Sequence, residues 1–108
     1  MEAIIPTHND YLYLKNILEV LRKTKQITNI HVVNSSSDEN IASLLKKICS
    51  SVERCLYYEY PVKGKGLAIK TALMNTKEAI LFLDADIENF SLDMVLSLIE
   101  KFNGGYDV

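Results

Sequence analysis

Two aspartates separated by a single residue give the clearest chemical signal in this sequence: Asp84 and Asp86 flank Ala85. Side chains at positions i and i+2 of an extended segment point the same way, so these two carboxylates can bind one ligand together. Carboxylate oxygens suit Mg²⁺ or Mn²⁺ bridging to a substrate phosphate. The alternative is an acidic turn in solvent, because Asp is a common turn residue.

The residues before the two aspartates predict the strand that carries them. Residues 80–83 form an uninterrupted apolar run, which is typical of a strand buried on both faces of a parallel sheet. Ligands bind at the carboxyl ends of such strands in open α/β sheets. Asp84 and Asp86 are therefore expected at the ligand-binding edge.

Strand and helix patterns alternate along the whole chain. Strands are expected over residues 2–5, 27–33, 55–60 and 80–83, and helices over residues 11–23, 39–51, 67–75 and 92–102. Pro6 is expected to end the first strand, because proline has no N–H to donate. The expected caps are Asn9 or Asp10 for the first helix, Ser37 or Asp38 for the second and Ser91 for the last.

This alternation predicts one α/β domain over residues 1–108, with a Rossmann-like, mostly parallel sheet of about four strands and helices on both faces. Residues 106–108 look like the start of a further strand. We therefore expect a domain truncated at its C-terminus, as the front half of a longer enzyme or as a module that associates.

Composition narrows the possible functions. The 108 residues are 48% hydrophobic with a net charge of −2, which gives no electrostatic reason to bind nucleic acid or anionic membranes. No apolar segment approaches the ~20 residues of a membrane span. Cys49 and Cys55 form no CxxC pair and are expected as free thiols of a cytoplasmic protein.

Polar loops follow all four expected strands, at residues 6–10, 34–38, 62–66 and 84–89. In the third loop, Gly64 and Gly66 allow close approach of a ligand to the backbone, and Lys65 adds a positive charge. The spacing fits neither a P-loop nor a dinucleotide fingerprint. Of the two histidines, His8 is expected in solvent and His31 as a structural residue with one hydrogen-bonded nitrogen.

Taken together, the four loops resemble the nucleotide-sugar-binding half of GT-A glycosyltransferases of family 2, and most closely glucosyl-3-phosphoglycerate synthases. The matching segments are AIIPTHND, IHVVNSSSDEN, GKGLAIKTAL and ILFLDADIENFS. The similarity extends over all 108 residues, with the motifs in the family's order.

The resemblance implies a set of donor-binding residues, all in these loops: Pro6, Thr7, Asn9, Asp10, Asn34, Ser35, Gly64, Lys65, Asp84 and Asp86. The first four would border the base and ribose, and the next two would contact the base. Gly64 and Lys65 would lie on the base and phosphate side. Asp84 would contact the ribose or sugar, and Asp86 would bind the metal. The family usually has Glu at position 10 and Asp at position 34.

The function implied is donor binding by a glycosyltransferase, with a UDP- or GDP-sugar and Mg²⁺ or Mn²⁺, and with no catalytic residue identified. One alternative is a non-catalytic half-domain that self-associates as a homo-oligomer and retains residual nucleotide binding. The other is a haloacid-dehalogenase-like phosphatase with Asp84 as nucleophile and Asp86 as acid/base. That motif normally reads DxDxT and opens the chain, whereas this one reads DADIE.

Overall fold

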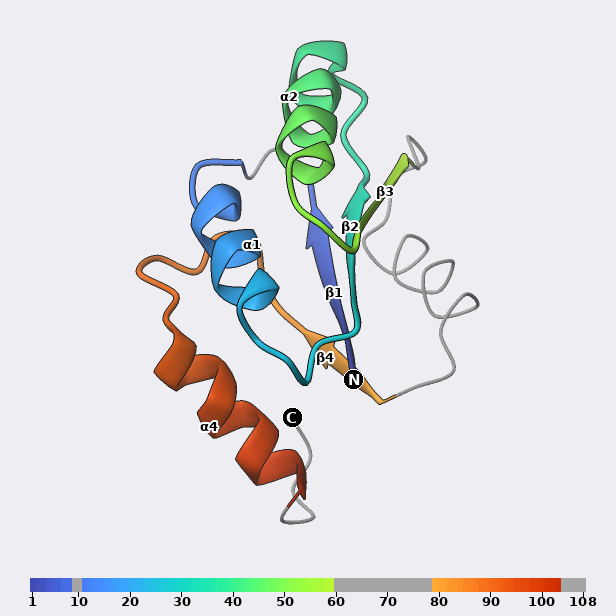
Figure 1. The fold of residues 1–108 in the computed structure, drawn as a ribbon. Helices are drawn as coiled ribbons and strands as arrows, with labels where there is room; N and C mark the ends of the chain where they lie inside the picture. Colours follow the sequence, from blue (N-terminus) through green and yellow to red (C-terminus); the bar gives the residue numbers. More distant parts are fainter. Residues whose placement is uncertain (9–10, 60–78, 104–108) are drawn as a thin grey trace.

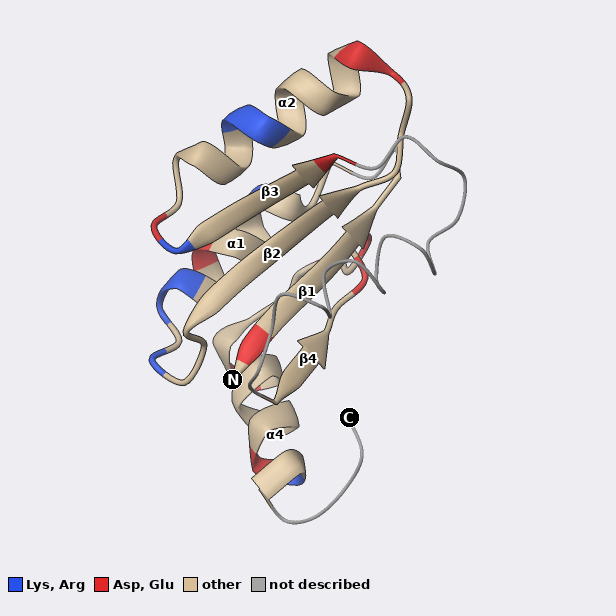
Figure 2. Cartoon of the chain, turned by 90° about the vertical axis from the view of Figure 1, so that its right-hand side faces the viewer, with Lys and Arg blue, Asp and Glu red and all other residues tan. Residues whose placement is uncertain are grey.

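A computed structural model describes residues 1–8, 11–59 and 79–103 of the chain. Its elements are β1 (Glu2–Thr7), α1 (Leu14–Arg22), β2 (Asn29–Asn34), α2 (Glu39–Ser50), β3 (Cys55–Glu59), β4 (Ile80–Phe82) and α4 (Leu92–Asn103). The strands pair in parallel in the order β3-β2-β1-β4, side by side with their arrowheads in one direction (Figure 2). The α/β fold with a parallel four-stranded sheet is thus confirmed.

The described helices α1, α2 and α4 lie on one side of the sheet (Figure 1). The helix expected over residues 67–75 and the strand expected over 106–108 fall outside the described residues. None of the helices within the described ranges is long and apolar enough to cross a membrane.

Local capping explains where two of these helices begin. The Asp38 carboxylate accepts hydrogen bonds from the N–H groups of Asn40 and Ile41, which confirms it as the cap of α2. The Ser91 hydroxyl accepts from the Met94 N–H at 3.3 Å at the start of α4. For α1 the expected cap is wrong, because the helix begins only at Leu14 and its N-cap, Tyr13, makes no side-chain hydrogen bond.

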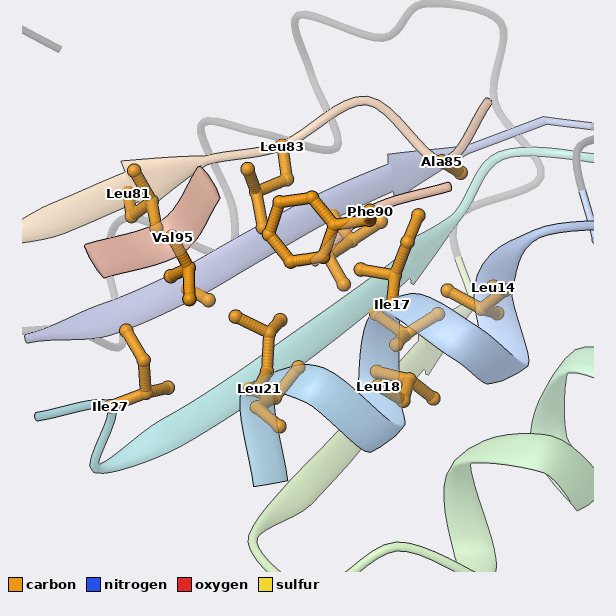
Figure 3. Packing of buried hydrophobic residues seen from close by; sticks show 14 of the residues in the cluster. Leu14, Ile17, Leu18, Leu21, Ile27, Leu81, Leu83, Ala85, Phe90 and Val95 are labelled. Atoms are coloured by element: carbon orange, nitrogen blue, oxygen red, sulfur yellow. The ribbon is translucent and has the colours of Figure 1, made fainter. Parts of the chain in front are cut away.

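One hydrophobic core joins these helices to the sheet (Figure 3). Its α1 members share helical spacing and complete burial: Leu14, Ile17, Leu18 and Leu21. They pack in the same cluster as Leu81, Leu83 and Phe90, and as Val95 of α4. Each fully buried aliphatic side chain contributes roughly 1.5–3 kcal/mol, so this cluster fixes α1 against the sheet.

The prediction that the fourth strand is buried on both faces is wrong. In the described sheet β4 is an outer strand that pairs with β1, and its side chains alternate between a buried Leu81 and a 43% exposed Phe82. An apolar run cannot distinguish a central strand from an outer one, because both require at least one apolar face.

On the sheet face opposite α1, a polar chain of side chains crosses three strands. His31 Nε2 lies 2.8 Å from the Glu2 carboxylate, and His31 Nδ1 lies 2.8 Å from the Tyr58 hydroxyl. His31 and Glu2 are buried, at 1% and 6% exposure. Both ring nitrogens are therefore hydrogen-bonded, one more than the sequence predicted.

The expectation of free thiols is also wrong, because Cys49 and Cys55 form a disulfide. The turn between α2 and β3 brings their Cα atoms to 5.6 Å, well within the range for a disulfide. This proximity depends on how the turn folds. The absence of a CxxC pattern therefore does not exclude a disulfide. The expectation of a cytoplasmic protein rested on the free thiols and loses that basis.

Replacing His31 by Ala should lower the free energy of unfolding by about 2–4 kcal/mol, because it leaves the buried Glu2 carboxylate and the Tyr58 hydroxyl without this partner. Chemical denaturation measures the loss. The chain's other histidine provides the control, since His8 is exposed and its replacement by Ala should have a much smaller effect. Equal losses for the two variants would contradict the structural role of His31.

Reducing the disulfide should lower the free energy of unfolding by about 2 kcal/mol, because a bond between residues six positions apart restricts the unfolded chain. Denaturation with and without a phosphine reductant measures this effect. The Cys49→Ser/Cys55→Ser variant should have the stability of the reduced protein and should not respond to the reductant.

Candidate functional site

The strand order places a topological switch point between β1 and β4. The chain runs from β1 outward through β2 to β3, and it then returns to the other side of β1 as β4. In open α/β sheets, ligands bind in the crevice outside the carboxyl ends of the two strands at such a point. Here His8 follows the end of β1, and Asp84 and Asp86 follow the end of β4.

Pro6 determines where β1 and β4 separate. Glu2 N–H donates to Ala79 O, and Ile4 O accepts from Leu83 N–H at 3.0 Å, so the even-numbered residues of β1 direct their backbone groups toward β4. Pro6 is next in this series and has no N–H to donate. The described β1–β4 pairing accordingly ends at Ile4 with Phe82, whereas β1 stays paired with β2 as far as Thr7.

The prediction that Pro6 ends the first strand is therefore wrong, because β1 continues to Thr7. Pro6 lacks an N–H on the side of β1 that faces β4, so the pairing between β1 and β2 stays intact. The loss of one hydrogen-bond donor thus affects only the side of β1 that faces β4.

The loops after β1 and β2 are joined to each other. Ser35 N–H and Ser35 Oγ both donate to Thr7 O, at 3.0 and 3.1 Å, and His8 Nδ1 lies 3.2 Å from Ser35 Oγ. Thr7 Oγ1 donates to Val33 O at 3.4 Å. Thr7 and Ser35 are 3% and 8% exposed, so these hydroxyls mainly hold the ends of β1 and β2 together.

Asn34 lies at the end of β2 and is fully buried. Its Nδ2 donates to the Tyr57 hydroxyl at 3.0 Å, and its Oδ1 accepts from Ser36 N–H at 2.9 Å. The contact to a base that the resemblance implies would require this side chain to leave both partners. In this structure, Asn34 stabilises the turn after β2 and orients Tyr57 of β3.

Tyr57 connects this turn to the end of β3. Its hydroxyl lies 3.2 Å from Ala42 O and 3.1 Å from the Glu59 carboxylate. Burial, together with the hydrogen bond to Glu59, raises the pKa of Tyr57 to about 12, although the bond from Asn34 opposes the shift. Beside it, Ser36, Ser37, Glu39, Ala42, Ser43 and Glu59 line a cleft of about 420 Å³.

Asp84 and Asp86 follow β4 on a short loop whose side chains alternate in exposure. Both aspartates are exposed, whereas Leu83 and Ala85 are 4% and 2% exposed and lie in the core. The loop returns to the core at Phe90, which packs in the cluster that contains Leu83 (Figure 3). The two carboxylates therefore lie between two points anchored in the core.

The carboxylate oxygens on this loop are suitable ligands for a divalent metal that also binds a substrate. Within the described residues no group of three His, Cys, Asp or Glu side chains could enclose a metal ion. Mg²⁺ is commonly bound through one or two carboxylates together with substrate phosphates. Asp84 and Asp86 could supply those carboxylates.

Four predicted site residues, Asn9, Asp10, Gly64 and Lys65, lie outside the described residues. Sequence reasoning missed two side chains that support the site. One is Tyr57, and the other is Asn16 of α1, whose Nδ2 donates to Phe90 O at 2.9 Å. A signal for Asn16 existed, because Asn is a poor helix former and here it stands inside a helix.

Stability should fall as the pH rises from 10 toward 12, because the unfolded chain loses the Tyr57 proton near pH 10 and the folded chain keeps it to about 12. Tyr57→Phe removes this contribution, so its stability should fall less over the same range. Urea denaturation at several pH values measures the difference. Tyr11→Phe, at an exposed tyrosine, should retain the wild-type fall.

Two comparisons with known proteins bear on this site. Residues 2–108 match the family model described as Glycosyl transferase family 2. The chain is also 30% identical over 110 residues to an uncharacterized glycosyltransferase of Rickettsia bellii (strain RML369-C). That alignment covers 95% of this chain and 15% of the relative, so the chain spans a small part of its length. Neither comparison supports the narrower resemblance to glucosyl-3-phosphoglycerate synthases.

Proposed function

Because the chain belongs to glycosyl transferase family 2, we propose that its carboxyl edge binds the nucleoside diphosphate part of a sugar donor for glycosyl transfer. The observation that carries the proposal is the pair of exposed carboxylates, Asp84 and Asp86, at the switch point beside β1. The family match gives no support to a phosphatase that uses the same two residues.

In this proposal Asp86 binds Mg²⁺ or Mn²⁺, with Asp84 as a second ligand or as a contact to the ribose or sugar. Breaking the anomeric C–O bond leaves negative charge on the diphosphate, and a metal held by these carboxylates would supply Lewis-acid stabilisation of that charge. The role of the chain is to keep both carboxylates in place at the crevice. Their anchored loop supports this role, since Leu83 and Phe90 are buried on either side of it.

The other donor contacts that we propose come from the end of β1 and from the segments that follow β1, β2 and β3 in the sequence. Pro6, Thr7, Asn9 and Asp10 would border the base and ribose, and Gly64 with Lys65 would face the base and phosphates. Ser35, which joins the ends of β1 and β2, would position these ends as well as contact the base. The proposed ligand is a UDP- or GDP-sugar.

A self-associating module is a second candidate, and α4 gives it a specific observation. Leu92, Met94 and Leu96 of α4 are 44%, 41% and 38% exposed, and Leu92 and Leu96, four residues apart, share one face of the helix. Sedimentation at several protein concentrations tests this candidate. A mass that rises with concentration, without any nucleotide binding, would favour it over donor binding.

Calorimetric titration with UDP and GDP, each with and without Mn²⁺, tests donor binding directly. We expect one nucleotide to bind in a metal-dependent manner. Asp86→Asn should lower its affinity at least tenfold in Mn²⁺, because the metal loses a charged ligand, and should have little effect without Mn²⁺.

Glu88→Gln provides the matched control, since Glu88 is an exposed acid two residues further along the same loop. It removes one negative charge but no proposed ligand, so its affinity should stay close to the wild-type value. Equal losses for the two variants would indicate a general charge effect. No binding of either nucleotide at millimolar concentration would overturn the proposal.

A further inference from the structure

Asn16 connects helix α1 to the loop that carries the two aspartates. Its Nδ2 donates to Phe90 O at 2.9 Å, across 74 positions of sequence. Ile17 and Leu18, which follow it in α1, are fully buried in the core. The Asn16 side-chain amide therefore projects from a helix that core packing holds firmly against the sheet.

The place where this bond meets the loop makes it informative. Phe90 is 3% exposed, and the residue before it, Asn89, has a φ of 56°, in the left-handed region that few residues other than Gly, Asn and Asp adopt readily. The backbone thus reverses into the core at a turn, and the Asn16 amide holds the carbonyl directly after that turn. Asp84 and Asp86 lie on the segment between this point and β4.

We propose that Asn16 is a positioning residue for the metal–diphosphate site, acting through Phe90 O on the loop of Asp84 and Asp86. The inference rests on the function proposed above. Mg²⁺ demands a near-octahedral arrangement and Mn²⁺ commonly adopts one, whereas the larger Ca²⁺ accepts variable coordination numbers and angles. A loop released at one end should therefore lose affinity for the smaller ions more than for Ca²⁺.

Two substitutions separate geometry from charge. Asn16→Ala removes the side-chain amide, and Asn16→Asp keeps its size but gives a carboxylate that cannot donate to Phe90 O. The added negative charge of Asp would by itself favour a cation. A loss of metal-dependent nucleotide affinity in both variants would therefore be due to the missing N–H donor to Phe90 O. Lys15→Ala, the adjacent exposed position on α1, is the control.

The measurement is the affinity for the nucleotide that the wild type binds, with Mn²⁺ and then Ca²⁺ as the metal, together with the melting temperature. Both Asn16 variants should lose about tenfold in Mn²⁺ and less in Ca²⁺, with Lys15→Ala unchanged. A purely structural role would lower the melting temperature and leave the Mn²⁺ to Ca²⁺ ratio unchanged, which would overturn the inference.

The two proposals fail in distinguishable ways. Metal-dependent binding by the wild type, with unchanged affinity in both Asn16 variants, would overturn the positioning role and leave the donor site standing. Absence of metal-dependent binding by the wild type would overturn both.

Discussion

The backbone hydrogen bonding of β1 is the constraint on which the rest of this structure depends. The strand pairs with β2 over its whole length and with β4 over its first half, so it lies at the centre of the described sheet. The backbone N–H and C=O groups of its even-numbered residues point toward β4, and Pro6 is the third of these residues. The point where β1 and β4 stop pairing is therefore set by the main chain.

Near this point, the polar residues divide into buried ones and exposed ones. Asn34, Thr7 and Ser35 are buried and bonded to neighbouring backbone or side chains. Asp84 and Asp86 are exposed. This division agrees with the proposed site, in which the ends of β1 and β2 would form one wall and the carboxylates of the β4 loop would meet the ligand. It also assigns supporting roles to side chains that a motif alone would treat as direct contacts.

The sequence was sufficient for two of the helix caps and for the order of strands and helices. Asp38 and Ser91 were recognisable as helix caps because the N–H groups they bind lie two or three residues away. Alternation of strands and helices likewise indicated the parallel α/β sheet. Features that depend on register between distant strands were not accessible. The side of β1 on which Pro6 lacks its N–H and the position of β4 at the edge of the described sheet follow from pairing that local patterns do not encode.

The same limit applies to the candidate site. Asp84 and Asp86 were found because two residues of sequence separation already place them together, whereas Asn16 and Phe90 meet across 74 positions. The Cys49–Cys55 bond depends on the fold of a turn that no spacing rule describes.

That disulfide also governs how the outer edge of the sheet can behave. β3 is an outer strand of the described sheet, and outer strands can pair with another molecule or exchange places between two copies of a chain. Here the first residue of β3 is bonded to the last turn of α2, so the strand cannot leave its own helix while the bond persists. Exchange of β3 alone between two molecules is thereby blocked, and reduction would remove this covalent barrier.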